Sequence, residues 1–234
     1  MIMSDTNYYE NTAPIISFIG CDGSGKSTLS HDIAQILNKE RKTEIFYLGL
    51  GSGELGRRIQ KWPIVGKYIE RVLSNKAKKT RSPTERIPGP VTAFVVFLFS
   101  CKRFLEFNKM YAAHKNGIQV VTDRYPQNEL IGYCDGPGLS ADRTNSPIIK
   151  WLARIERQLY QKMASVHPSI IIFLDVDVET AIERKPDHNF ALLDKKISYT
   201  RSLLFNGAPI KIVDARKSYG EVKNQVMSII KMYS

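Results

Sequence analysis

Residues 20–28 combine glycines, hydroxyls and a lysine at a spacing that can hold phosphate. The stretch satisfies the pattern G-x-x-x-x-G-K-[ST] in full, between a strand-like run and a helix-like run. Glycines let backbone N–H groups turn inward onto a phosphate, and the positive end of the following helix faces the same anion. The Lys26 ammonium would reach the β- and γ-phosphates, and the Ser27 hydroxyl would bind Mg²⁺. We therefore expect a nucleoside triphosphate to be bound by Gly20, Asp22, Gly23, Ser24, Gly25, Lys26, Ser27 and Thr28.

An acid and a base follow a second apolar run. Asp123 and Arg124 stand directly after the residues Val120, Val121 and Thr122. A carboxylate at a strand end can hold Mg²⁺ or orient an acceptor, and a guanidinium can grip phosphate oxygens as a fork. The pair predicts catalytic roles for both residues, with Asp123 also at the metal. A helix cap or a surface ion pair is the alternative interpretation.

An aromatic ring and a guanidinium share one face of a predicted helix. Phe99 and Arg103 are four residues apart, which places them on the same side of a helix over residues 91–114. Such a pair suits a flat, hydrogen-bonding base, because the ring can stack on it and the fork can read its edge. The alternative is a core phenylalanine beside an arginine whose stem packs along apolar surface.

Basic residues follow the predicted fourth strand. Arg184 and Lys185 come first, and Lys195, Lys196 and Arg201 follow. Phosphoryl transfer needs positive charge that arrives when the site closes, so we expect a lid at about residues 184–201. Arg184 would stabilise the charge in transit and Lys185 would contact ATP. A solvated helix end with dipole-complementing cations is the alternative.

Strands and helices alternate in the order needed to position these side chains. Continuously apolar runs predict strands over residues 15–20, 44–50, 119–123, 169–176 and 210–214, with helical stretches between them. This alternation predicts an α/β fold with three layers around a five-stranded parallel sheet. Ligands bind at the carboxyl ends of such strands, where the residues above lie.

Composition sets the remaining limits. The 234 residues carry 34 Lys and Arg against 23 Asp and Glu, a net charge of +11 that favours anionic partners. The short basic run at residues 76–81 lacks interleaved aromatics, so nucleic acid is not the partner we expect. No apolar run is long enough to span a membrane, and the polar N-terminus does not read as a targeting signal. Three scattered cysteines predict reduced thiols and a cytoplasmic protein.

The sequence resembles the thymidylate kinase family. Residues 18–30 are similar to the phosphate loop of that family, Asp123-Arg124-Tyr125 to its Asp-Arg-Tyr element, and Leu98-Phe99 with Arg103 to its Leu-Phe-x-x-x-Arg element. The resemblance implies a P-loop NTPase fold of the nucleoside monophosphate kinase type with a short lid. It implies that Phe99 stacks on the base, that Arg103 and Arg124 contact the nucleotide, and that Tyr133 belongs to the substrate site. Because these kinases are often dimers, a homodimer is consistent with it.

The sequence departs from the family in two places. Cys134 stands where the family has a glutamine, and the arginine element expected after the second strand is missing. We divide the chain into a flexible tail at residues 1–14 and a P-loop kinase domain at residues 15–234, with a basic elaboration at residues 51–90.

Three functions follow from these observations. The first is an ATP- and Mg²⁺-dependent kinase of a nucleoside monophosphate, which converts ATP and dTMP to ADP and dTDP. The second keeps the kinase but takes a phosphorylated sugar or another small non-nucleotide anion as acceptor. The third is a nucleotide-dependent binding or regulatory protein, which would show salt-dependent association and no small-molecule turnover.

Overall fold

A computed structural model describes residues 13–50 and 89–233 of the chain. Its centre is a five-stranded parallel sheet with the strand order β2-β3-β1-β4-β5. This confirms the predicted α/β class and parallel sheet. The strands are β1 (Ile15–Ile19), β2 (Thr43–Tyr47), β3 (Gln119–Asp123), β4 (Ile170–Asp175) and β5 (Ile210–Asp214).

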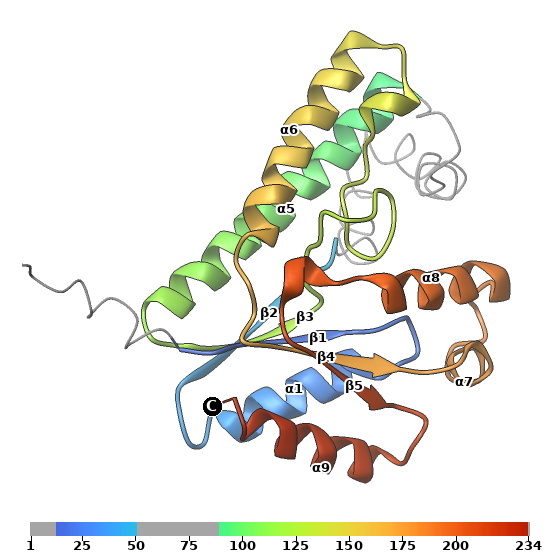
Figure 1. Cartoon of the computed structure of the whole chain (residues 1–234). Coiled ribbons are helices and arrows are strands. Elements are labelled where there is room, and N and C mark those ends of the chain that lie inside the picture. Colours follow the sequence, from blue (N-terminus) through green and yellow to red (C-terminus); the bar gives the residue numbers. More distant parts are fainter. Residues whose placement is uncertain (1–12, 51–88, 234) are drawn as a thin grey trace, which may run out of the picture.

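The middle strands are buried and mostly apolar because helices cover both faces of the sheet. Every residue of β1 is buried, and successive side chains point to opposite faces. Ile16 and Phe18 join one core cluster, whereas Ile15 and Ile19 join another on the opposite face. The sheet is therefore the middle layer of three, as Figure 1 shows.

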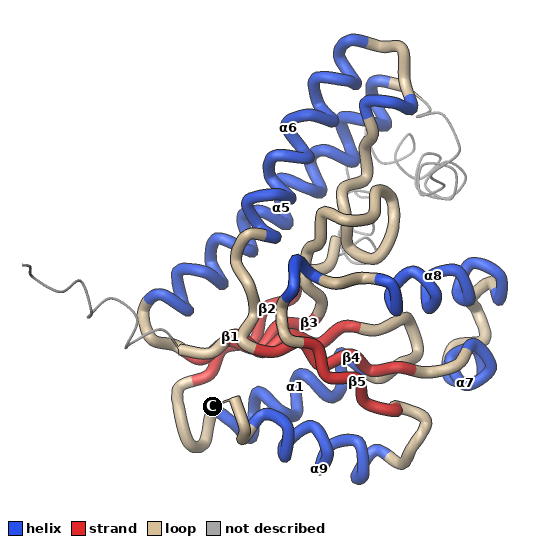
Figure 2. Tube along the Cα trace, in the orientation of Figure 1, coloured by secondary structure: helices blue, strands red, loops and turns tan. Residues whose placement is uncertain are grey.

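Helices form the outer layers (Figures 1 and 2). Helices α1 and α9 lie side by side under one face of the sheet, and α5 and α6 pair along the other and extend well beyond it. Helices α7 and α8 lie next to the carboxyl end of β4. The bounds are α1 (Lys26–Leu37), α5 (Pro90–Lys115), α6 (Pro147–Ala164), α7 (Val178–Arg184), α8 (Phe190–Ser202) and α9 (Tyr219–Ile230), with short 3₁₀ turns η2 (Ala141–Arg143) and η3 (Phe205–Gly207).

Two predicted segments fall largely outside this description. Of the predicted tail, only Ala13 and Pro14 are described: Ala13 is buried, and its carbonyl oxygen lies 2.6 Å from Nδ1 of His114. The basic elaboration at residues 51–90 lies outside the described residues except for Gly89 and Pro90. Within residues 13–50 and 89–233, no helix combines the length and apolar character needed to cross a bilayer.

Candidate active site

The loop between β1 and α1 approaches its neighbours too closely for ordinary side chains. Gly20 has a φ of +151°, and a Cβ there would lie 2.7 Å from the carbonyl oxygen of Leu174. Gly23 has a φ of +89°, and its Cβ would lie 2.7 Å from the carbonyl oxygen of Ala181. Both positions need glycine because space and backbone conformation exclude a side chain. The loop is thus in close contact with the end of β4 and the middle of α7.

Lys26 opens helix α1 and folds back into the loop. The preceding residue, Gly25, has a left-handed backbone (φ +84°), and the Nζ of Lys26 donates to the carbonyl oxygen of Cys21 at 3.0 Å. Burial lowers the pKa of Lys26 to about 8, and the nearby Arg124 acts in the same direction. A phosphate at this loop would relieve the cost of the buried cation. Ser24 supports this, because its Oγ is buried with no partner among the described residues.

Ser27 and Asp123 come together from two elements. The Oγ of Ser27, in the first turn of α1, donates to Oδ2 of Asp123 at 2.5 Å. Asp123 is the last residue of β3, and its Oδ1 is buried without a hydrogen-bond partner in the described chain. A buried carboxylate oxygen with no partner is the kind of group that a cation would satisfy. Thr28 follows on the exposed side of α1.

The Ser27 hydroxyl and the Asp123 carboxylate fit a magnesium ion of the kind that phosphoryl-transfer enzymes use. Mg²⁺ keeps several waters and is held by one or two protein oxygens together with substrate phosphates. Among residues 13–50 and 89–233, no three His, Cys, Asp or Glu side chains gather as a metal site of their own. The Ser27–Asp123 pair is therefore suited to a magnesium–nucleotide complex.

Asp22 gathers positive charge around the phosphate loop. Its carboxylate lies 2.6 Å from Nζ of Lys196, 3.1 Å from a terminal nitrogen of Arg124 and 3.7 Å from Nζ of Lys26. Nε2 of His188 lies 3.8 Å away. Burial alone would raise the pKa of Asp22, but the surrounding cations, Lys196 foremost, hold it far below its ordinary value. The Asp22 carboxylate is charged, and it forms ion pairs with the same cations that a bound phosphate would contact.

Arg124 connects the phosphate loop to a second carboxylate. One terminal nitrogen donates to Asp22, and the other lies 3.3 Å from Oδ2 of Asp135. The residue has a φ of +75°, and its backbone N–H donates to the carbonyl oxygen of Phe18. Burial would lower the pKa of Arg124, but Asp135 and the other nearby acids raise it. A left-handed residue at a strand end is strained, and such strain concentrates at functional sites.

Arg103 is not free to reach a ligand as the sequence suggested. Its side chain is fully buried: one terminal nitrogen donates to the Asp135 carbonyl oxygen at 2.6 Å and to the Tyr160 hydroxyl at 2.8 Å. The other terminal nitrogen donates to Oδ1 of Asp135 at 2.7 Å. Phe99, one turn earlier on α5, keeps 8% of its surface exposed. The predicted shared helix face is present, and it is packed into the protein.

The lid residues lie at the rim of the loop. Arg184, at the end of α7, donates to the carbonyl oxygen of Gly23 at 3.3 Å and to that of Ala215 at 2.9 Å. Lys185 follows it on the surface. Tyr133 packs against Tyr199 of α8, with ring centroids 4.5 Å apart. Helix α8 therefore reaches the loop that carries Asp135.

The structure brings most of the predicted residues into one cluster. Lys26, Ser27, Asp123 and Arg124 meet at the carboxyl ends of β1 and β3, with Arg184 at the edge. Sequence reasoning missed Asp135 as the partner of both arginines. It treated Lys196 only as one charge of the lid, although Lys196 lies closest of the cations to Asp22.

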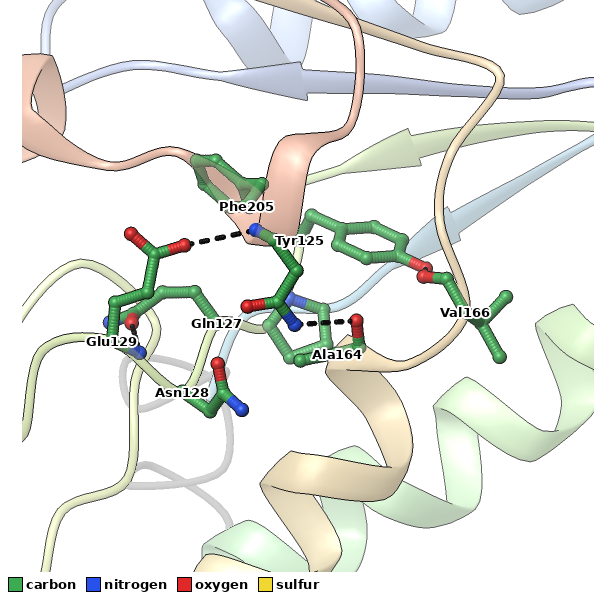
Figure 3. Close-up of a pocket in the computed structure, with 9 residues that line it drawn as sticks. Tyr125, Gln127, Asn128, Glu129, Ala164, Val166 and Phe205 are labelled. Atoms are coloured by element: carbon green, nitrogen blue, oxygen red, sulfur yellow. Dashed lines mark hydrogen bonds between the residues drawn. The ribbon is translucent and has the colours of Figure 1, made fainter.

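A hollow beside this cluster has a structural role. In Figure 3 the Tyr125 hydroxyl donates to the carbonyl oxygen of Val166 at 2.6 Å, and the backbone N–H of Asn206 donates to Glu129 at 3.2 Å. The Asn206 amide also donates to the carbonyl oxygen of Ala164 at 3.0 Å. None of the predicted site residues lines this hollow. Its contacts fasten the loop after β3 to the end of α6.

Comparison with known proteins shows relatives along nearly the whole chain. No family model matches the sequence. The chain is 42% identical over 219 residues to the protein described as uncharacterized ATP-binding protein YghR of Escherichia coli (strain K12), covering 93% of this chain and 87% of that protein. It is 41% identical over 215 residues to the ATP-binding protein YghS of the same strain, covering 91% of each.

More distant similarities extend to kinases. A probable thymidylate kinase of Archaeoglobus fulgidus is 28% identical over 225 residues, covering 94% of this chain and 95% of the relative. The structure of deoxyadenosine kinase from M. mycoides with bound dATP shares the fold, with a TM-score of 0.53 at 17% identity, over 93% of this chain and 99% of that one. This chain therefore belongs to the YghR family of ATP-binding proteins, within the thymidylate kinase-like P-loop phosphotransferases.

Proposed function

We propose that the chain transfers the γ-phosphoryl group of ATP to a nucleoside monophosphate, with dTMP as the first acceptor to test. The products would be ADP and the nucleoside diphosphate. The single observation that carries the proposal is the contact between Ser27 and Asp123. It joins the phosphate loop to the end of β3 at 2.5 Å and leaves one buried carboxylate oxygen for a cation.

On the donor side, each residue acts by position and charge. Lys26 would hold the β- and γ-phosphates, and Ser27 and Asp123 would hold Mg²⁺, which neutralises charge that develops on the transferred group. Asp22 would have to release Lys26 and Arg124 to the incoming phosphates, because its carboxylate lies within 4 Å of both. No covalent intermediate is needed when positioning and electrostatics supply the catalysis.

On the acceptor side, Arg124 would bind the phosphate of the monophosphate. It lies next to Asp123 and already joins the phosphate loop to Asp135. Phe99 and Tyr133 would form the walls of the base site, and Arg103 would act there through Asp135. Arg184 and Lys185, at the loop rim, would add positive charge when the lid closes.

A phosphorylated sugar or another small non-nucleotide anion is the second candidate acceptor. Two observations favour it. Phe99 keeps only 8% of its surface exposed, so little ring is open to a base. Both terminal nitrogens of Arg103 are engaged by Asp135 and Tyr160.

A cytoplasmic location, a homodimer and the domain bounds stay predictions from the sequence.

The deciding experiment is coupled ATP turnover with Mg²⁺, comparing dTMP with UMP, CMP, GMP, AMP and no acceptor. Strong stimulation by dTMP alone would support the first proposal. Stimulation by none of the nucleotides, with ATP still bound, would contradict a nucleotide acceptor and direct the search to phosphorylated sugars. The third function, a nucleotide-dependent binding protein, would show no turnover with either class of acceptor.

A further inference from the structure

Polar side chains are buried between helices α5 and α6, away from the phosphate loop. Ser100 and Arg103 come from α5, and Glu156 and Tyr160 come from α6. Each keeps 2% of its surface exposed or less. We call these four residues the polar ladder. An apolar interface would hold two helices together at lower cost, because burying charged groups carries a desolvation penalty.

Glu156 forms the first rung and also holds a loop. Its Oε1 accepts from the Ser100 hydroxyl at 2.5 Å and from the backbone N–H of Gly138 at 3.2 Å. Its Oε2 accepts from the backbone N–H of Leu139 at 2.7 Å. Burial raises the pKa of Glu156, and these three hydrogen bonds oppose the rise. Two of its three donors are therefore backbone groups of the loop.

Arg103 and Tyr160 form the second rung, one helical turn away. Arg103 donates to the Tyr160 hydroxyl at 2.8 Å and to the Asp135 carbonyl oxygen at 2.6 Å. It also forms an ion pair with the Asp135 carboxylate at 2.7 Å. The second rung thus holds the same loop three residues earlier than the first.

The loop between the two rungs fits closely against α5. A Cβ at Gly138 would lie 2.5 Å from a methyl group of Val96, so the backbone approaches the helix directly. At its other end, Asp135 has a φ of +64° and contacts Arg124 at 3.3 Å. The second rung holds Asp135 directly, and the first rung holds the backbone of the same loop at Gly138 and Leu139. Asp135 is one of the two carboxylates that contact Arg124.

We infer that Glu156 is a positioning residue for the acceptor side of the site, acting through the 135–139 loop on Asp135 and Arg124. The expected effect on acceptor binding rests on the proposed function, whereas the expected loosening of the 135–139 loop does not. If the first rung is weakened, the loop loosens and Arg124 loses one of its two anchors. Acceptor binding should weaken, whereas ATP binding at the phosphate loop should not.

The test uses two ladder variants and a control in the full chain. Glu156→Gln keeps the size of the side chain and removes an acceptor, and Ser100→Ala removes one donor with less risk to folding. The control is Thr43→Val, which removes the buried hydrogen bond from Thr43 to Gln119 (3.1 Å) at the amino ends of β2 and β3. KM for dTMP and for ATP is measured for each, together with amide hydrogen exchange over residues 134–139.

The expected result separates the two substrates. For both ladder variants, KM for dTMP rises. The rise is about ten-fold for Glu156→Gln, which is the effect of losing one hydrogen bond to a charged group. KM for ATP stays within about two-fold of the wild-type value. Exchange over residues 134–139 becomes faster. Thr43→Val lowers Tm and leaves both KM values and this exchange unchanged.

Two other results have different meanings. If both KM values change together, or if neither changes, Glu156 has no positioning role and the inference is overturned. If the wild-type protein does not use dTMP, the proposed acceptor is wrong, and hydrogen exchange then decides the inference alone. Faster exchange at residues 134–139 in both ladder variants upholds the ladder, and unchanged exchange overturns it.

Discussion

The donor side and the acceptor side of this site are built from contacts of different range. On the donor side, residues 20–28 make their own cradle: Lys26 bonds the carbonyl oxygen of Cys21, five residues earlier, and contacts Asp22, four residues earlier. On the acceptor side, Arg103 pairs with Asp135, 32 residues away, and with Tyr160, 57 residues away. The donor side thus combines local contacts of Lys26 with long-range contacts, such as those of Ser27 with Asp123 and of Asp22 with Lys196, whereas Arg103 is held by tertiary packing alone.

The two sides also differ in how their charges are satisfied. Burial lowers the pKa of Lys26, and a bound anion would stabilise the charge of its ammonium group. On the acceptor side, Asp135 and Tyr160 accept hydrogen bonds from both terminal nitrogens of Arg103. Lys26 is therefore placed to bind an anion, and Arg103 is placed to hold the protein's own loop through Asp135. Substitutions should separate activity from stability along this division.

The largest effect is expected for Lys26→Met. We expect the rate of phosphoryl transfer to fall by about a thousand-fold, because a cation aimed at the transferred phosphoryl group is lost. The free energy of unfolding should change little, since methionine fills the space and removes a cation that burial disfavours. Coupled turnover and urea denaturation measure the two effects. The control is Lys39→Met, at an exposed lysine just past α1. Turnover near the wild-type rate would contradict the donor assignment.

The second prediction reverses this pattern on the acceptor side. Arg103→Met should lower the free energy of unfolding by about 3 kcal/mol, because it leaves the Asp135 carboxylate buried with one partner fewer. The matched control is Arg201→Met, which breaks an ion pair with Asp175 (3.0 Å) that is half exposed on the Arg201 side. That loss should stay below about 1 kcal/mol because solvent screens the pair. Equal decreases in the free energy of unfolding in the two variants would show that the Arg103–Asp135 pair stabilises the fold no more than the exposed pair.

The same division explains what the sequence could predict. The five strands lie within two residues of the predicted bounds at nearly every end, because each is a short, mainly apolar and β-branched run between helical stretches. The phosphate loop could be predicted equally well, because its pattern is contiguous in the sequence and its glycines are required at positions with positive φ. Asp123 and Arg124 followed from their place at a strand end.

The acceptor side was not readable in this way. Asp135 is an acidic residue among glycines and prolines, and no local pattern pairs it with Arg103 or Arg124. Glu156 did leave a signal, because it occupies a buried position in the helical repeat of α6, between Ala153 and Tyr160. A carboxylate at a core position requires partners, so the repeat could have indicated a buried polar contact without saying which residues supply it.

The smallest expected effect is a dependence of ATP affinity on pH. Burial and the neighbouring Arg124 lower the pKa of Lys26 to about 8, and a bound triphosphate should raise it, because an anion favours the charged ammonium. Binding near pH 8 then takes up a proton, and affinity falls as pH rises through this value, by about ten-fold between pH 7 and pH 9.

Calorimetry in two buffers of different ionisation enthalpy measures this proton uptake directly. Wild-type protein at pH 8 should give buffer-dependent binding enthalpies for ATP, and Lys26→Met should remove that dependence. A binding enthalpy that is the same in both buffers would mean that Lys26 is already fully charged before ATP binds. Asp22 would then stabilise the charge of Lys26 without ATP, as Asp135 stabilises the charge of Arg103, and the two sides would not differ in how these charges are held.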